Sequence, residues 1–169
     1  MPIENPRALF IFMLSDVRQS TERLKDFFRE VSQLTRDPTV KEALEARLFV
    51  ADKIIATLDK CFDLIGEQPV KTSGRLYDVF IEEFRKEFAE ILNPATKRLF
   101  LLTKINLLTQ LQVGEYIGLI AAADFTHHSG ISVLLESCLA DKLAFVERTR
   151  RLILPQQFGG QLLRYKRIA

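Results

Sequence analysis

One segment of this sequence combines strong hydrophobicity with regularly spaced polar side chains. Between Leu99 and Ala123 most residues are apolar, but four polar residues recur at intervals of three: Thr103, Asn106, Thr109 and Gln112. Residues three apart are neighbours on an α-helix, although such a row drifts around the axis. A helix this apolar is expected to be buried on most sides. Its hydroxyl and amide groups can form hydrogen bonds in a core, but they are not the carboxylates and imidazoles of a metal centre.

The residues that could bind a metal ion are few. A di-iron or di-manganese centre in a helical bundle needs carboxylates from several helices, usually with a His one turn from a Glu, and no Glu-x-x-His is present in the sequence. His127 and His128 are adjacent, as is typical of polar groups at a helix end. Glu115 and Asp141 are the carboxylates expected to point inward. An alternative site would combine these two with Asp124 and the histidines, and it requires all five groups to converge.

Other patterns offer little chemistry. The seven glycines form neither GxGxxG nor GxxxxGK, so no phosphate-binding loop is predicted. Cys61 and Cys138 are too few for a disulfide framework and are expected to be buried, reduced thiols. The thirteen phenylalanines could line a cavity for a small apolar ligand, but their helical spacing is more typical of a packed core.

Length and composition indicate a single globular domain. A chain of 169 residues can bury a sizeable core. The formal net charge of +2 does not indicate nucleic-acid binding, and the basic C-terminal residues are expected to form a solvated tail. The apolar run from Leu9 to Leu14 lies between Glu4 and Asp16 and lacks the features of a signal peptide. No stretch is long and uncharged enough to predict a membrane span. We therefore expect a cytoplasmic protein.

The elements that must position these residues are five helices, with no convincing strand. Asn5 and Asp37 each precede a proline, a pair typical of a helix start, and Asn93-Pro94 separates two helices. Gly66 is typical of a left-handed helix end, and Ser129-Gly130 is expected to break the chain. The predicted helices cover about residues 6–36, 38–65, 75–92, 94–128 and 131–154.

The connections between these helices predict their packing. Short loops between long amphipathic helices favour antiparallel neighbours. We therefore predict an all-α, up-and-down four-helix bundle with one additional short helix over residues 1–154, followed by a C-terminal tail at 155–169. The short helix, the third, is expected to pack through an apolar side that includes Leu76, Val79, Phe84 and Phe88.

Four segments resemble a known family: 12–24, 58–66, 111–118 and 134–142, which read FMLSDVRQSTERL, LDKCFDLIG, LQVGEYIG and LLESCLADK. Their order and local sequence are similar to the ferritin-like family typified by the bacterial stress proteins YciE and YciF, whose function is largely unknown. The resemblance extends to about Leu152. It implies a ferritin-like bundle that forms a homodimer, and it implies where the family holds a metal.

At those implied metal positions this sequence departs from the family. The positions are occupied, helix by helix, by Thr21, Val50, Ile54, Val79, Thr109, Gln112 and Asp141. Only Asp141 keeps a carboxylate, so we expect a lost metal site and no cofactor. The substitution is physically consistent, because bare carboxylates in a core are destabilising without their metal. Neutral Thr and Gln side chains can instead satisfy each other's hydrogen bonds.

Three hypotheses for function follow. The leading one is a non-catalytic structural or interaction protein, with a stress-related role implied by the resemblance and a second copy of the chain as partner. One alternative is a metal-dependent oxidoreductase of di-iron type, or a metal-binding protein, with an atypical site. The other is a binder of a small apolar ligand between the helices.

Overall fold

Three of the helices, α1, α2 and α4, begin at the capping residues that the sequence predicts. The computed structural model describes residues 3–154, which form α1 (Pro6–Leu34), α2 (Pro38–Ile65), α3 (Arg75–Glu90), α4 (Pro94–Phe125) and α5 (Ser129–Ile153). The side chains of Asn5, Asp37 and Asn93 accept hydrogen bonds from amides of the first turns of α1, α2 and α4, and a proline follows each of them. Gly66 ends α2 with a φ of 67°, as predicted.

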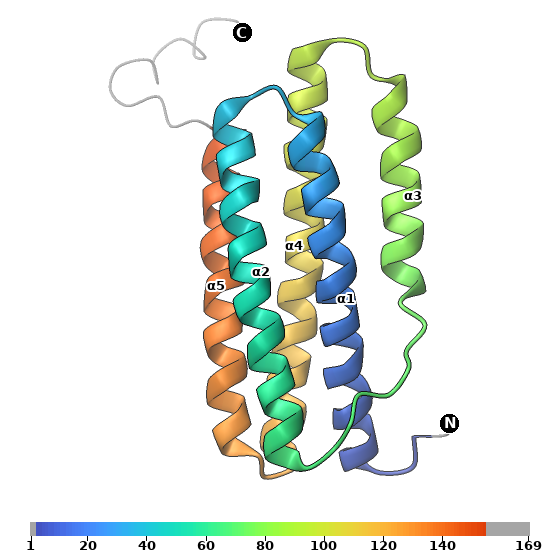
Figure 1. The fold of residues 1–169 in the computed structure, drawn as a ribbon, viewed down its shortest axis with the longest axis vertical. Coiled ribbons are helices and arrows are strands. Elements are labelled where there is room, and N and C mark those ends of the chain that lie inside the picture. Colours follow the sequence, from blue (N-terminus) through green and yellow to red (C-terminus); the bar gives the residue numbers. More distant parts are fainter. Residues whose placement is uncertain (1–2, 155–169) are drawn as a thin grey trace, which may run out of the picture.

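The four long helices form the bundle and α3 lies outside it (Figure 1). Contacts join α1 to α2, α2 to α5, α5 to α4 and α4 to α1, so the four helices enclose one core. Residues 66–74 and α3 together form the single long crossover, and α4 consequently runs in the same direction as α2. The crossover is fastened to α1, because the Val70 amide donates to Ser15 Oγ over 3.0 Å and Thr72 donates to Gln19. One long crossover is a feature of ferritin-like bundles.

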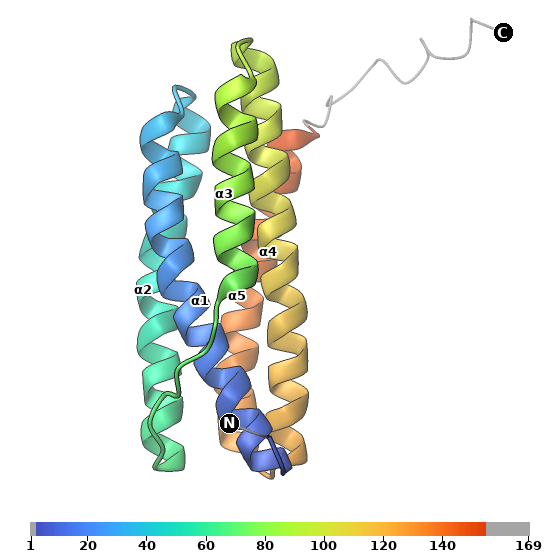
Figure 2. The ribbon, with the colours of Figure 1, turned by 90° about the vertical axis from the view of Figure 1, so that its right-hand side faces the viewer.

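Helix α3 covers the upper part of the α1–α4 side only, as Figure 2 shows. It buries Tyr77, Ile81, Phe84 and Phe88, and the Phe84 ring meets the Phe27 ring edge-on at 5.0 Å between centroids. The apolar side predicted for this helix is partly wrong. Leu76 and Val79 are 58% and 48% exposed, because Tyr77 and Ile81 occupy the inner face instead.

The connection between α4 and α5 lies slightly earlier than predicted. His127 adopts a left-handed φ of 61°, and the His128 amide donates to the Ala123 carbonyl over 2.9 Å, so this histidine pair forms the helix end. Ser129-Gly130 was expected to break the chain, but it is the first turn of α5. The predicted tail at 155–169 lies outside the described residues. Within residues 3–154 no helix has the length and hydrophobicity needed to cross a membrane.

Two apolar clusters fill the bundle, one above the other. The upper cluster contains Phe28, Leu44 and Leu108 and also takes in the inner face of α3, and the lower cluster contains Leu14, Ile54 and Leu119. Their phenylalanine rings pack directly on one another, as in the stacked pair Phe84 and Phe88 at 5.3 Å. Both cysteines are buried and free, as the sequence predicts. What separates the two clusters is a set of polar side chains.

Candidate functional site

A polar layer crosses the bundle at the boundary between the two apolar clusters. We use this name for six buried side chains drawn from all four bundle helices: Thr21 of α1, Arg47 of α2, Thr109, Gln112 and Tyr116 of α4, and Lys142 of α5. Each of them is at most 3% exposed. Since polar and charged groups are rarely buried without a partner, this layer is the first place to look for function.

Arg47 is held in the layer by one hydrogen bond and two aromatic rings. Its Nη2 donates to Gln112 Oε1 over 2.8 Å. The guanidinium carbon lies 5.6 Å from the centroid of the Phe28 ring and 5.2 Å from that of Phe145. The Nε and Nη1 groups have no hydrogen-bond partner among the described residues. Burial lowers the pKa of Arg47 to about 10, although Tyr116 and Asp141 act in the opposite direction.

Lys142 is the second buried cation of the layer. It is fully buried, and its Nζ lies 4.9 Å from the centroid of the Tyr116 ring. No described residue accepts a hydrogen bond from this amine. Burial lowers the pKa of Lys142 well below its ordinary value, and repulsion from Arg47 lowers it further. Cys138, Glu115 and Asp141 act in the opposite direction without reversing the shift.

The two threonines of the layer donate their hydroxyl protons to backbone carbonyls of their own helices. Thr21 Oγ1 donates to the Val17 carbonyl over 2.7 Å, and Thr109 Oγ1 donates to the Ile105 carbonyl over 2.9 Å. The Tyr116 hydroxyl is buried without a hydrogen-bond partner among the described residues, and burial raises its pKa well above the ordinary value. The layer thus presents several N–H and O–H donors and no free carboxylate.

The residues aligned with the family's metal positions do not all meet. Thr21, Ile54, Thr109 and Gln112 are buried, whereas Val50 is only partly buried beside the lower cluster. Val79 was expected to face the core, which is wrong, because α3 stands outside the bundle and this residue is exposed on it. Thr103 was expected to be a core polar group, and that prediction is also wrong, because its side chain is exposed and donates to the Leu99 carbonyl.

Asp141 points toward the rim of the bundle rather than into the layer. Its carboxylate accepts a hydrogen bond from Lys53 over 2.9 Å, in an ion pair whose side chains are 28% and 56% exposed. The neighbouring Lys142 takes the inward position, because consecutive residues on a helix point about 100° apart. The one carboxylate that the alignment retains is therefore already neutralised by a protein cation.

The other candidate ligands are dispersed. Glu115 is partly buried and one of its oxygens, Oε2, has no hydrogen-bond partner among the described residues. Burial raises the pKa of Glu115, and the Tyr77 hydroxyl acts in the opposite direction. Asp124 accepts a hydrogen bond from Ser132 Oγ over 2.5 Å, and the His128 ring stacks on Phe10 at 5.4 Å. Over residues 3–154 no three or more His, Cys, Asp or Glu side chains gather where they could hold a metal ion, so the convergence required by the alternative site is not found.

The sequence analysis missed the two cations, although their spacing contains a signal. Arg47 follows Leu44 by three residues and precedes Ala51 by four, and all three are buried on α2. Lys142 follows Cys138 by four residues and precedes Phe145 by three on α5. A basic residue in register with an apolar stripe can extend outward or be buried, and only the packing around it decides between these outcomes.

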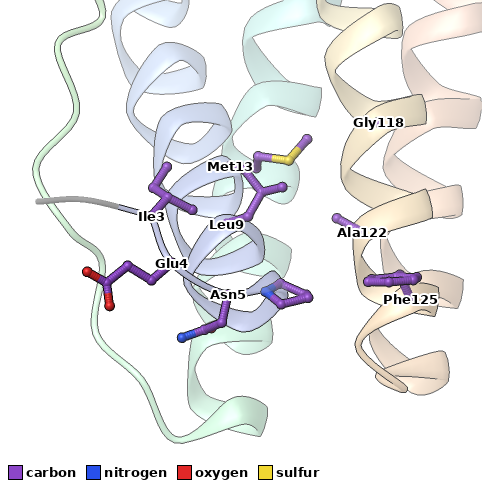
Figure 3. A pocket seen from close by; sticks show the side chains of 9 residues that line it. Ile3, Glu4, Asn5, Leu9, Met13, Gly118, Ala122 and Phe125 are labelled. Carbon is purple, nitrogen blue, oxygen red and sulfur yellow. The ribbon is translucent and has the colours of Figure 1, made fainter.

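A second unusual region lies on the outside of the bundle, below the first turn of α3. An apolar groove of about 490 Å³ runs between the start of α1 and the end of α4. Figure 3 shows Leu9 and Met13 on one side of it and Ala122 and Phe125 on the other. Phe125 is 72% exposed. Gly118 lies where the helices approach closely, since a Cβ there would be 3.3 Å from Met13 Cε.

Comparison with known proteins identifies the class. The chain belongs to the family described as a domain of unknown function (DUF892), whose model matches residues 5–154. Its fold is similar to that of YcfI, "a putative structural protein from Rhodopseudomonas palustris", with a TM-score of 0.84 and 19% identity, over 88% of this chain and 94% of that one. It is also similar to the E. coli stress protein YciF, with a TM-score of 0.83 and 17% identity, over 89% and 95% of the two chains. Among curated proteins none matches the sequence significantly.

These comparisons confirm the ferritin-like, YciF-like fold that the sequence predicts. At identities below 20% they establish the shared architecture alone. What this particular chain does must be argued from its own polar layer and its own surface.

Proposed function

We propose that this protein is a non-catalytic member of its family that acts as a structural or interaction protein through its outer surface. The observation that carries the proposal is the pair of buried cations, Arg47 and Lys142, in the centre of the bundle. A catalytic centre of the di-iron type needs that space for anionic ligands and a divalent metal. Here the space is occupied by positive charge, a neutral amide and aromatic rings.

The electrostatics of the layer oppose a metal ion. At an effective dielectric constant of about 20, a divalent ion at about 6 Å from one unit positive charge is repelled by roughly 5 kcal/mol. Arg47 also occupies the Gln112 carbonyl oxygen, so the other oxygens of the layer are the neutral hydroxyls of Thr21, Thr109 and Tyr116. Hard metal ions need several oxygen ligands at once. The polar layer offers too few oxygen ligands for such an ion.

The outer surface supports the interaction part of the proposal. The groove exposes apolar side chains of both its helices, such as Leu9 of α1 and Phe125 of α4. Ion pairs lie on other faces, for example Arg85 with Glu30 and Arg23 with Asp78, beside single exposed apolar side chains such as Phe49. A contiguous apolar region bordered by polar residues is typical of a protein interface. We assign it to a second copy of this chain, so the functional unit is a homodimer.

The cellular role is proposed more broadly. One structural neighbour is described as a stress protein and another as "a putative structural protein". A structural or stress-related role for this chain agrees with both descriptions and needs no reaction centre. Two buried free thiols agree with a reducing compartment such as the cytoplasm.

Thermal unfolding with added metals tests the proposal. The protein, treated first with a chelator, is heated in the presence of Fe²⁺ (without oxygen), Mn²⁺ or Zn²⁺ at stoichiometric concentration and in moderate excess. A ligand that binds only the folded state raises the Tm. We expect no rise with any of these ions. A rise of several degrees with Fe²⁺ or Mn²⁺, saturating near one or two ions per chain, would overturn the proposal.

A further inference from the structure

We propose that the polar layer binds a small monovalent inorganic anion, of halide size, between Arg47 and Lys142. Three N–H groups of these two residues, Nε and Nη1 of Arg47 and Nζ of Lys142, are buried and find no acceptor among the described residues. The Tyr116 hydroxyl is a further buried polar group of the layer without a partner among the described residues. Buried donors without a partner are costly, and charged ones are the most costly.

The nearby acidic groups do not neutralise the two cations. Asp141 pairs with Lys53 at the rim. Glu115 is close enough to influence the pKa of Lys142, but it makes no hydrogen bond to that amine. Over residues 3–154 the only acceptor bonded to Arg47 is the neutral Gln112 amide. Arg47, and Lys142 in its protonated form, therefore face one layer with no carboxylate bonded to either, and an anion bound between them would attract both and favour the protonated amine.

The chemistry of the layer selects an anion over water. A water molecule accepts hydrogen bonds but must also donate, and it brings no compensating charge. Arg47 Nε and Nη1 and the protonated Lys142 amine can only donate, and although the hydroxyl oxygens of Thr21, Thr109 and Tyr116 could accept from a water molecule, water cannot neutralise the positive charge. The ring faces near Arg47 and Lys142 stabilise the cations only in part.

The burial of the layer selects a small ion. The side chains of Arg47, Gln112, Tyr116 and Lys142 are each at most 3% exposed, so a bound ion would be enclosed by the bundle. A halide fits this description better than an organic acid or a phosphate, which would need an opening. The inference does not rest on the proposed function, because the interior can bind an anion whatever the surface does.

The test compares anions at constant ionic strength. Tm is measured as sodium bromide replaces sodium gluconate, whose large anion serves as the reference. We expect the Tm to rise with bromide, by roughly 3–5 °C for each tenfold increase above the dissociation constant. Lys142→Met, which keeps the length of the side chain without its charge, is expected to abolish the rise. Lys60→Met removes an exposed lysine of α2 and should retain it.

Crystals grown in bromide supply a readout that is independent of folding. We expect an anomalous scattering peak within hydrogen-bond distance of Lys142 Nζ and Arg47. The proposal is overturned by an unchanged Tm, by an equal bromide effect in Lys142→Met, or by water in place of the peak. If Lys142→Met does not fold, the anomalous map of the unaltered protein decides the question.

Discussion

The centre of the bundle and the groove below α3 both depart from the usual rule that apolar side chains are buried and charged ones are exposed, but they do so in opposite ways. The centre buries two cations and an amide, whereas the groove exposes leucine, methionine and phenylalanine. Both regions lie along α4, which is apolar around most of its circumference. The centre is enclosed by the four bundle helices, whereas the groove between α1 and α4 is left uncovered because α3 begins above it (Figure 2).

The two regions differ in what they can do: the buried centre can only affect the stability of the fold, whereas the exposed groove can contact another molecule. The polar layer is closed to partners, so any protein that recognises this chain must use the outside. The groove is open and apolar, so it is the region where association gains most from removing surface from water. In a member of a fold class that often places its chemistry in the core, the exposed region is thus the better candidate for function.

The largest effect is expected at the centre. Arg47→Ala should lower the free energy of unfolding by about 3 kcal/mol, because it leaves a cavity between Phe28 and Phe145 and removes the hydrogen bond to Gln112. Arg47→Met fills the space without the charge and should lose no more than about 1 kcal/mol. Urea denaturation measures both. Equal losses in the two variants would show that the charge, rather than the packing, stabilises the layer.

The next effect concerns the groove. Phe125→Glu replaces an exposed apolar ring with a carboxylate and should weaken the proposed homodimer at least tenfold, which corresponds to about 1.4 kcal/mol or more. Phe49→Glu is the matched control, because Phe49 is also exposed but lies on α2, away from the groove. Light scattering over a dilution series gives the mass. A dimer that survives Phe125→Glu unchanged would assign the interface to another face.

The third effect is a pH dependence. Without a bound anion, burial lowers the pKa of Lys142, so between that lowered pKa and the ordinary value of 10.5 the folded state binds one proton fewer than the unfolded state. The stability of the unaltered protein relative to Lys142→Met should therefore rise with pH, by up to about 1.4 kcal/mol per unit. Urea denaturation from neutral pH to about pH 9 in gluconate buffer measures this difference. A flat or falling difference would mean that Lys142 keeps its charge in the fold.

The smallest change in stability is expected at Asp141, which precedes Lys142 in the sequence. Asp141→Asn removes a partly exposed ion pair with Lys53, and such pairs contribute between zero and about 1 kcal/mol. We expect a loss below about 0.5 kcal/mol, measured in the same urea experiment. A loss of several kcal/mol would place Asp141 among the groups that stabilise the layer, and would restore it as a candidate ligand.

The sequence predicts the helices well because their ends depend on local chemistry. Asn5, Asp37, Asn93 and Gly66 each fix a boundary through their own side chain or backbone, whatever the helix packs against. The rotation of a helix about its axis is a different matter. On α3 the choice between Val79 and Tyr77 as inward residues depends on the helix lying outside the bundle, which no local signal reveals.

The same limit applies to the candidate site. Thr21, Thr109 and Gln112 were predicted inside and are inside, since polar residues within an apolar stripe remain on that stripe. Arg47 and Lys142 were missed because a basic side chain can extend to water from most helix positions, and only the surrounding helices prevent it. Asp141 was predicted to point inward, but its neighbour Lys142 does so instead, because one position along a helix changes the direction of a side chain by about 100°.

The metal content of the purified protein tests the central claim most directly. The chain is produced in cells grown with added iron, manganese and zinc, purified without chelators, and measured by elemental analysis against its concentration. The account predicts far less than one transition-metal ion per chain, because Arg47 and Lys142 occupy the centre of the bundle. One or two tightly bound ions of iron or manganese per chain would contradict it.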